Sequence, residues 1–309
     1  MSSLRRLSRP SLALALLGAL GLGSLPACKK TPDADSNTPA TGAGGPAAAN
    51  GTVLRYKAAP AKLKESIKVS FAISGDNQAG EIKVDATGLL DVSDAGSGKL
   101  KIGYSLLEVR ELEVTGALKP KPKEGQPAPD LKAQLLAGKG ARIVDLLGEE
   151  DDAATKVLPE NKKPEAKQDE MDAGSFASFL GMPDDLPTEG LVEGKPWKTK
   201  KEKPEKLGPL EIDMEIDLTY TLVKIDASSG KRLAEIKIES EASGAKELAQ
   251  GGKTIMISLD TTSESTIVFN LDDQVPVSYR VAATQAGNYG QFGSSETQVK
   301  IDATYEPAT

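Results

Sequence analysis

The chain has 309 residues and carries 38 Lys and Arg against 45 Asp and Glu, so its formal net charge is −7. An acidic chain of this kind disfavours nucleic acid as a partner, because a nucleic-acid-binding surface is basic. The sequence contains no histidine and a single cysteine, which excludes the Ser-His-Asp triad, the Cys-His dyad and metal sites built from His or Cys. We therefore expect a non-enzymatic protein with no cofactor and no metal centre, and an enzyme is the least favoured class.

Residues 1–27 have the three parts of an export signal. The chain starts with a basic stretch that contains three arginines, continues with an apolar run from Leu12 to Leu25, and reaches a small residue at Ala27. The run is shorter than the roughly 20 residues that a membrane-spanning helix needs. The segment is therefore predicted to be a signal peptide rather than a permanent transmembrane anchor.

The only cysteine lies immediately after this apolar run, in the sequence Leu25-Pro26-Ala27-Cys28. These four residues resemble the lipobox of bacterial lipoproteins, in which a peptidase cuts before a cysteine that carries a diacylglyceryl group. The resemblance implies that Cys28 is lipidated and that its acyl chains anchor the mature protein to a membrane of the cell envelope. Lys29 follows the cysteine, and by resemblance to enterobacterial lipoproteins it implies the outer membrane. The alternative is cleavage by the ordinary signal peptidase, which would leave Cys28 as a free thiol.

Residues 28–52 form the next segment, which is predicted to be a lipidated, disordered tether. From Lys29 to Thr52 it contains three prolines, four glycines and no apolar residue larger than alanine. Such a composition cannot bury a core. As a flexible coil it would span roughly 25 to 30 Å, enough to hold a folded domain away from a membrane surface.

Residues 53–309 are predicted to form a single β-rich domain. Between Ser66 and Ser74, apolar residues alternate with small or polar ones, which is typical of a strand with one buried and one wet face. Phe71 lies on the apolar face and Lys68 on the other. The first half of the domain contains four further segments of this type, at 53–57, 81–86, 100–106 and 109–118.

The second half repeats the pattern in six segments. The longest extends from Leu210 to Leu222, and its apolar face alternates with acidic and threonine residues. About eleven strands in total are typical of a closed barrel, an opened barrel or a β-sandwich. The remaining five predicted strands lie at 233–241, 253–260, 266–272, 276–284 and 297–305.

Residues 119–209 differ from both halves, because they are rich in Pro, Lys and Glu and poor in large apolar residues. We predict a helical and loop insert here, with an acidic helix at Asp145–Leu158 and a short amphipathic helix at Gln168–Leu180. The second helix has an apolar stripe that would cover the concave side of the sheet as a lid, formed by Met171, Phe176 and Phe179.

The insert ends in the sequence from Leu186 to Trp197, which contains a Pro turn, an apolar pair, a Gly turn and the only tryptophan. This segment resembles the approach to the second half of the sheet in secreted bacterial β-proteins of the lipoprotein-carrier superfamily. The resemblance implies an open half-barrel of about eleven antiparallel strands, with helices on its concave side. Fold alone does not fix function.

Four short motifs carry weaker chemical signals. Gly252-Lys253-Thr254 ends like a phosphate-binding loop, and Ser228 with Lys231 spells Ser-x-x-Lys, but both lie between predicted strands and are interpreted as turns. The acidic run Glu149–Asp152 is interpreted as a solvated loop or helix start rather than a calcium site. The Gly287–Gly293 loop carries two aromatic residues, which either pack onto the end of the sheet or contact a carbohydrate or a partner.

These observations lead to one principal hypothesis. The protein is predicted to be a lipid-anchored, non-enzymatic envelope protein whose half-barrel binds a hydrophobic ligand or an envelope protein in its concave face. Its groove and lid would involve Met171, Phe176, Phe179 and Trp197. The alternative is a structural or scaffold lipoprotein with a filled core and no ligand.

Overall fold

The computed structural model of the chain describes residues 51–57, 61–76, 78–120, 122, 127–159, 186–207, 210–250 and 253–308. The predicted signal peptide, Cys28, most of the tether, and the predicted helix with Met171, Phe176 and Phe179 lie outside the described residues.

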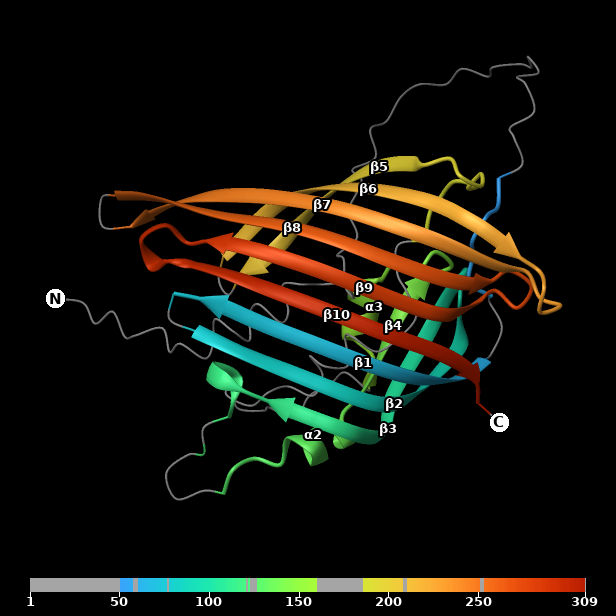
Figure 1. Cartoon of the computed structure of the whole chain (residues 1–309), viewed down its shortest axis with the longest axis horizontal. Coiled ribbons are helices and arrows are strands. Elements are labelled where there is room, and N and C mark those ends of the chain that lie inside the picture. The colour runs from blue at the N-terminus through green and yellow to red at the C-terminus, as the bar shows by residue number, and fades with distance from the viewer. Residues whose placement is uncertain are drawn as a thin grey trace, which may run out of the picture.

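Ten strands form one antiparallel sheet in the order β4-β3-β2-β1-β10-β9-β8-β7-β6-β5 (Figure 1). The first and last strands, β1 and β10, are neighbours at the centre, while β4 and β5 form the two edges, so the sheet is open. Its ten strands are β1 (Ala61–Gly75), β2 (Gln78–Gly96), β3 (Lys99–Val114), β4 (Lys139–Asp145), β5 (Trp197–Leu207), β6 (Leu210–Asp226), β7 (Leu233–Gln250), β8 (Lys253–Asn270), β9 (Val275–Asn288) and β10 (Ser294–Pro307). The short helices are η1 (Gly116–Leu118), α2 (Leu131–Ala137), α3 (Asp152–Lys156) and η3 (Gly290–Phe292).

The mainly β architecture and the open sheet confirm the predicted fold class, but several elements were predicted wrongly. Two predicted pairs, 100–106 with 109–118 and 253–260 with 266–272, are single long strands, β3 and β8. Residues 53–57 are not a strand of the sheet, and α3 is much shorter than the predicted acidic helix at Asp145–Leu158.

The predicted insert at 119–209 is also not purely helical, since it supplies both edge strands. β4 is buried on both faces over most of its length, so it lacks the alternation that marks a half-exposed strand. β5 is rich in Lys and Glu and contains Pro204. An edge strand tolerates a proline because one of its sides has no neighbouring strand to bond.

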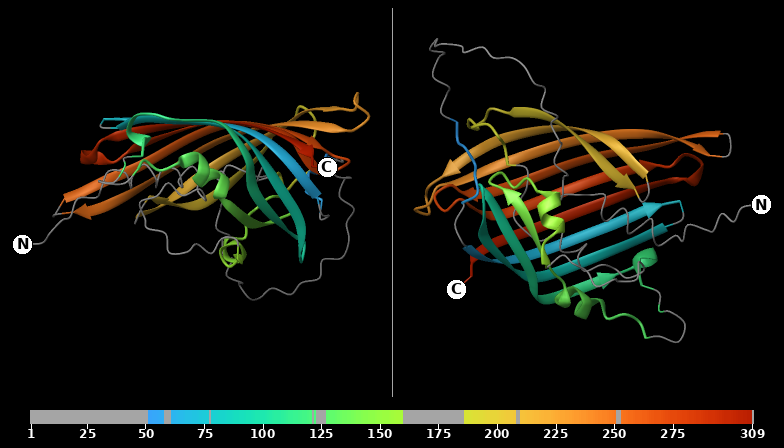
Figure 2. Two further views of the ribbon diagram at one scale, coloured as in Figure 1. Left: turned by 90° about the horizontal axis from the view of Figure 1, so that it is seen from below. Right: turned by 180° about the vertical axis from the view of Figure 1, so that it is seen from behind.

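The central strands confirm the predicted alternation of buried and exposed faces. Phe71 on β1 is 1% exposed, whereas the side chain of Lys68 on the opposite face is 73% exposed. The sheet curls strongly (Figure 2). One face of its central strands is buried, as at Ile67, Val69 and Phe71 of β1. Irregularities in the β2–β3 pairing, between Asp85 and Ala86 and between Thr87 and Gly88, add to the twist of the strands.

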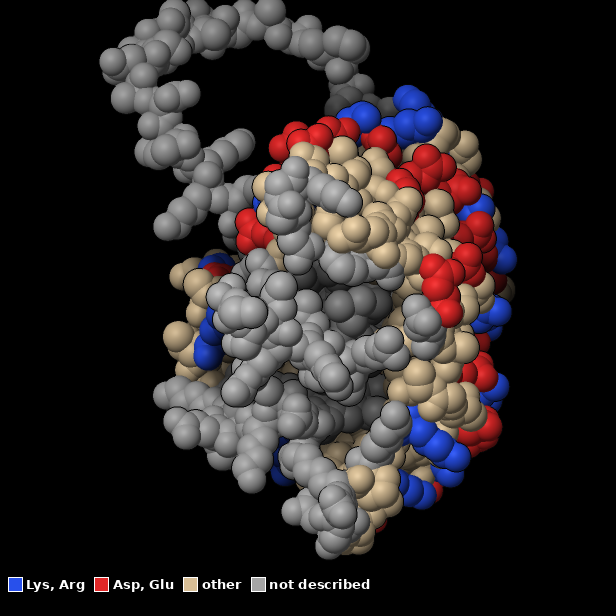
Figure 3. Space-filling view, turned by 90° about the vertical axis from the view of Figure 1, so that its left-hand side faces the viewer, with Lys and Arg blue, Asp and Glu red and all other residues tan. Residues whose placement is uncertain are grey.

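The convex face is charged. Ion pairs join neighbouring strands across it, such as Lys237 with Glu264 at 3.1 Å and Arg280 with Asp302 at 3.4 Å. Figure 3 shows acidic and basic side chains interspersed along the outer side of the sheet. Such exposed pairs contribute little to stability individually, but they make this face a surface suited to water.

An N-terminal strap, residues 51–57, fills one end of the concave side. Leu54 and Tyr56 are 0% and 2% exposed, and the Tyr56 ring packs against Phe269 of β8 with ring centroids 5.6 Å apart. Backbone hydrogen bonds hold the strap, because Tyr56 N–H donates to the Leu146 carbonyl and Thr52 exchanges two bonds with Leu191. The strap is therefore part of the core.

The helices in the described part of the chain are all short, and none has the length and apolar character that would let it cross a membrane.

Candidate functional site

The concave face contains a band of polar residues on four neighbouring strands, which we call the polar belt. It consists of inward-facing side chains of β7 to β10, which lie in three adjacent rows of paired positions. Thr297 pairs with Gln285, and Gln285 pairs with Thr261, so these three residues form one row across three strands. The belt comprises Ser240, Thr261, Ser263, Ser265, Gln285 and Thr297.

The belt changes from buried to partly exposed along its rows. Thr297 and Gln285 are 0% and 3% exposed, whereas Thr261 and Ser263 on β8 and Ser240 on β7 are partly exposed. Hydrogen bonds link its members, since the Gln285 side-chain amide donates to Thr261 Oγ1 at 3.3 Å and the Ser240 and Ser263 hydroxyls lie 2.9 Å apart. The concave face is therefore accessible near β7 and β8, unlike the end that the strap fills.

Large apolar residues flank the belt on both sides. Phe71 and Val299 lie on the side of the central strands, and Met214 and Leu218 of β6 lie on the other, all of them buried. On β7, Ala242 lies between Thr261 of the belt and Ile216 of β6, whereas the belt residue Ser240 pairs directly with Leu218 of β6. Ser240 and Ala242 are both partly exposed. The arrangement combines an apolar surface with a few hydrogen-bonding groups, which is typical of sites for small amphiphilic molecules.

A second polar group, nearer to the strap, contains buried charges. Glu65 of β1 is fully buried and Arg142 of β4 is 8% exposed. Burial raises the pKa of Tyr305 well above its usual value, the charge of Glu65 raises it further, and Arg142 lowers it. Both charges thus lie close to the same buried phenol, and opposite charges at such a position compensate one another.

The same buried charges also lie near Tyr104 of β3, beside the edge strand β4. Burial raises the pKa of Tyr104, while the charge of Arg142 lowers it and that of Glu150 raises it. A side chain at Gly140 would collide with the Tyr104 hydroxyl, so glycine lets the ring lie across β4. We interpret this cluster as structural, because it lies between the core and β4 and its charges have opposite signs.

The edge strand β5 places Trp197 at the same face as the belt. Trp197 is half-buried and packs against Tyr220 of β6, with ring centroids 5.1 Å apart. The structure therefore puts Trp197 on the concave face, as the groove hypothesis requires, whereas Met171, Phe176 and Phe179 lie outside the described residues.

β5 also carries two charged residues that point inward, Lys203 and Glu205, each 9% exposed. Glu205 pairs in register with buried Ile212. Burial raises the pKa of Glu205 to about 7, against a smaller lowering by the charge of Lys203. The carboxyl group therefore titrates near neutral pH in the folded chain.

We expect Glu205→Gln to stabilise the protein more at pH 8 than at pH 5, by about 2 kcal/mol. In the folded protein the raised pKa keeps the proton on Glu205 up to about pH 7, while the unfolded chain loses it near its ordinary value. The free energy of unfolding therefore falls as the pH rises from the ordinary pKa of glutamate to about 7. Glutamine does not ionise, so the variant keeps this stability. Urea unfolding of the parent and the variant at pH 5 and pH 8 measures the difference in the free energy of unfolding.

The matched control is Glu211→Gln, at an exposed position of the neighbouring strand β6. It should give no pH-dependent gain. An equal effect of Glu205→Gln at pH 5 and pH 8 would contradict the assignment of a buried carboxyl group to β5.

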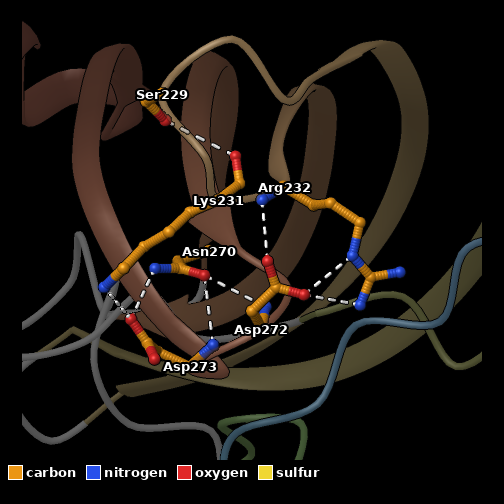
Figure 4. A network of polar contacts seen from close by, with 6 residues as sticks. All are labelled: Ser229, Lys231, Arg232, Asn270, Asp272 and Asp273. Carbon is orange, nitrogen blue, oxygen red and sulfur yellow. Dashed lines mark hydrogen bonds and ion pairs between the residues drawn. The ribbon is translucent and has the colours of Figure 1, made fainter.

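The short motifs that the sequence singled out are turns in the structure. Lys231 of the Ser-x-x-Lys sequence binds the Asp273 carboxylate at 2.5 Å, and Arg232 binds Asp272, so two neighbouring hairpin turns are tied together (Figure 4). Asn270 completes the network, since its amide donates to Asp273 at 2.7 Å. Lys231 is therefore held in an ion pair at the rim of the sheet.

The other motifs are also structural. Lys253 and Thr254 enter β8 directly after a hairpin, as Lys253 pairs with Gln250. Asp151 of the acidic run caps α3 by accepting from Ala154 N–H and binds Lys99 at 2.5 Å. Tyr289 of the glycine-rich loop is 7% exposed and packs onto the end of the sheet, as one of the two interpretations predicted.

The hairpin end of β9 and β10 bounds a shallow cavity of about 360 Å³ on the outer side of the sheet. Its lining is polar and small, and includes the exposed acids Asp260 and Glu296. In the part of the chain that the structure describes, no group of three or more His, Cys, Asp or Glu residues is arranged to hold a metal ion. The concave face, which combines apolar and hydrogen-bonding side chains, is therefore a better candidate ligand site than this cavity.

No protein-family model matches the sequence, and no curated protein is significantly similar to it. Among solved structures, the chain is similar to an outer membrane channel from Pseudomonas putida F1, with 13% identity over 82% of this chain and 97% of that chain and a TM-score of 0.24. It is also similar to OmpT, an outer membrane protein of Vibrio cholerae, with 9% identity over 80% of this chain and 100% of that chain and a TM-score of 0.18. TM-scores this low carry no argument about function, which must be argued from the side chains themselves.

Sequence reasoning did not identify the polar belt. Ser240 and Thr297 lie within the predicted strands 233–241 and 297–305, whereas Gln285 lies just beyond the predicted strand 276–284. The other three belt residues lie between the predicted strands 253–260 and 266–272, where β8 in fact continues without a break. An inward-facing polar row in an otherwise apolar strand is the signal that could have indicated the site.

Proposed function

We propose that the chain is an exported, lipid-anchored envelope protein that binds a hydrophobic ligand along the concave face of its open sheet. The observation that carries the proposal is the partial exposure of inward-facing residues on β7 and β8, including Ala242 and Ser263, beside a buried apolar surface. A hydrocarbon chain that lies on a concave, apolar and incompletely covered sheet face removes apolar surface from water, and this burial favours binding.

The anchor is supported by the sequence, in which an apolar signal is followed directly by Leu25-Pro26-Ala27-Cys28. Two acyl chains on one cysteine suffice for stable attachment to a bilayer. The convex face adds no attraction to an anionic membrane, because acids and bases are interspersed over it. The acyl chains would therefore provide nearly all of the membrane binding, and we propose the outer membrane as the site.

Cys28→Ala is expected to release the protein from the membrane fraction into the soluble fraction. The change removes the acylation site, and no other part of the proposal supplies an anchor. Fractionation with fatty-acid labelling measures both effects, and Cys28→Ser serves as a second unacylated variant. Retention in the membrane fraction, together with an unlabelled parent protein, would refute the lipoprotein proposal.

The ligand is tested with the full mature chain carrying Cys28→Ala, titrated with lauric acid and with a short-chain phospholipid. Trp197 lies on the concave face, so saturable binding should change its emission. Ala242→Phe places a large ring on the inner face of β7 and should weaken binding at least about tenfold by filling the space. Ala245→Phe on the exposed outer face of the same strand is the matched control.

A second candidate, a scaffold with a filled core, is favoured by one observation. The N-terminal strap already occupies one end of the concave side, with Leu54 and Tyr56 fully buried. Absence of saturable binding by any lipid class, in a protein whose circular dichroism shows an intact sheet, would favour this scaffold and contradict the ligand proposal.

A further inference from the structure

Two buried polar atoms of the concave face make no hydrogen bond in the structure. They are the side-chain oxygen Oε1 of Gln285 and the hydroxyl oxygen Oγ1 of Thr297, on residues that are 3% and 0% exposed. A buried polar atom that has lost water without gaining a partner destabilises a protein by roughly 1 to 3 kcal/mol. Two such atoms on paired positions of β9 and β10 therefore indicate a place where a hydrogen-bonding group from another molecule is accommodated.

The two atoms belong to the row of the polar belt that leads toward accessible residues. Gln285 reaches Thr261 of β8 through its amide nitrogen, at 3.3 Å, and Thr261 and Ala242 continue the row with partial exposure. The amide oxygen of Gln285 accepts a hydrogen bond, and the Thr297 hydroxyl can both accept and donate. A molecule entering over β7 and β8 would thus meet two unsatisfied groups on adjacent strands.

The surroundings of the belt specify an uncharged partner. In the three rows that contain the belt, the side chains contributed by β7 to β10 are all uncharged. The charged residue in the Gln285 row is Lys201, on β5, which lies four strands away, roughly 19 Å along the curved sheet. An anionic headgroup placed at Gln285 would lose its hydration without meeting a cation from β7 to β10 in these described rows, so phosphate and carboxylate are disfavoured.

Apolar residues lie on both sides of the belt across the sheet, on the central strands and on β6. Phe71 and Val299 lie beside Thr297 on the inner face of the central strands, and Leu218 and Met214 lie beyond β7. A hydrocarbon chain attached to the hydrogen-bonding group would therefore have an apolar surface to cover in either direction.

We propose that the polar belt recognises the uncharged hydroxyl- or amide-bearing part of an amphiphile, with its hydrocarbon lying over the apolar residues of the central strands or of β6. This inference rests on the proposed ligand-binding function and specifies the class of ligand. Gln285 accepts a hydrogen bond from the ligand, and Thr297 exchanges one with it.

The test compares two probes with the same acyl chain, 1-monolauroylglycerol, which has two hydroxyl groups, and methyl laurate, which has no hydrogen-bond donor. The full mature chain with Cys28→Ala is titrated below the aggregation concentration of each probe, with Trp197 emission as the readout. We expect 1-monolauroylglycerol to bind about tenfold more tightly than methyl laurate, which is the effect of one or two satisfied hydrogen bonds.

Thr297→Val removes the hydroxyl group and keeps the shape of the side chain. It should reduce the difference between the two probes, because one of the two recognition groups is lost, while the affinity for methyl laurate changes less than about twofold. It should also raise the midpoint of thermal unfolding of the ligand-free protein, because an unsatisfied buried group has been removed. Thr262→Val, on the exposed outer face of β8, is the matched control and should change neither affinity.

The outcomes separate this inference from the function on which it rests. Equal affinity for the two probes, with no selective effect of Thr297→Val, would overturn recognition at the belt and leave hydrophobic binding in place. Saturable binding of neither probe nor of lauric acid or a phospholipid would overturn both.

Discussion

Phe71→Asp is expected to lower the free energy of unfolding by at least about 3 kcal/mol. Phe71 is 1% exposed at the centre of the sheet, where it pairs with Val299 of β10 and Ile82 of β2. A carboxylate at this position would be buried among apolar side chains without a partner. Urea unfolding followed by Trp197 emission and circular dichroism measures the change.

Two further variants keep this prediction testable if Phe71→Asp does not fold. Ile67→Val, on the same face, should cost about 1 kcal/mol, and Lys68→Gln, on the opposite face, should cost about 0.5 kcal/mol or less, because it removes only an exposed ion pair. Similar losses at Ile67 and Lys68 would show that the alternation in β1 does not define a buried face.

Tyr56→Ala should destabilise the protein by about 3 to 5 kcal/mol, the range for truncating a large buried aromatic side chain. Tyr56 belongs to the strap rather than to the sheet, yet it is 2% exposed and its ring packs on Phe269. The variant therefore measures how much the strap contributes to the stability of the domain.

Val53→Ala is the control for the strap, because Val53 lies in the same segment and is 53% exposed. It should change stability by no more than about 0.5 kcal/mol. If Tyr56→Ala cost as little as Val53→Ala, the strap would be a surface segment, and the concave face would be open at both ends.

The sequence was sufficient to predict the strands that have one wet face. β1 and β6 alternate strictly, because their outward side chains are in water and their inward ones are in the core. The two edge strands escaped prediction for opposite reasons. β4 is buried on both faces and so has no period, whereas β5 has an inner face that includes Lys201, Lys203 and Glu205 and so shows no apolar stripe.

The candidate site could be predicted only in part. Trp197 was proposed as a possible groove or lid residue because it precedes a long strand, and in the structure it pairs with Tyr220, which is buried. The belt could not be derived, because it depends on the register between β8, β9 and β10, which brings Thr261, Gln285 and Thr297 into one row. Register is set by the pairing of whole strands, and a single residue gives no local sign of it.

The position of β1 beside β10 has a consequence for how this chain reaches its folded state. The central pairing joins segments from opposite ends of the domain, such as Val69 with Ile301. Contacts between residues so distant in sequence form slowly, because a long loop must close before they stabilise anything. During synthesis, β1 therefore has β2 on one side but no neighbour on the other until β10 has emerged. The edge of β1 that later pairs with β10 is open for most of that time, and an unpaired strand edge is prone to aggregation.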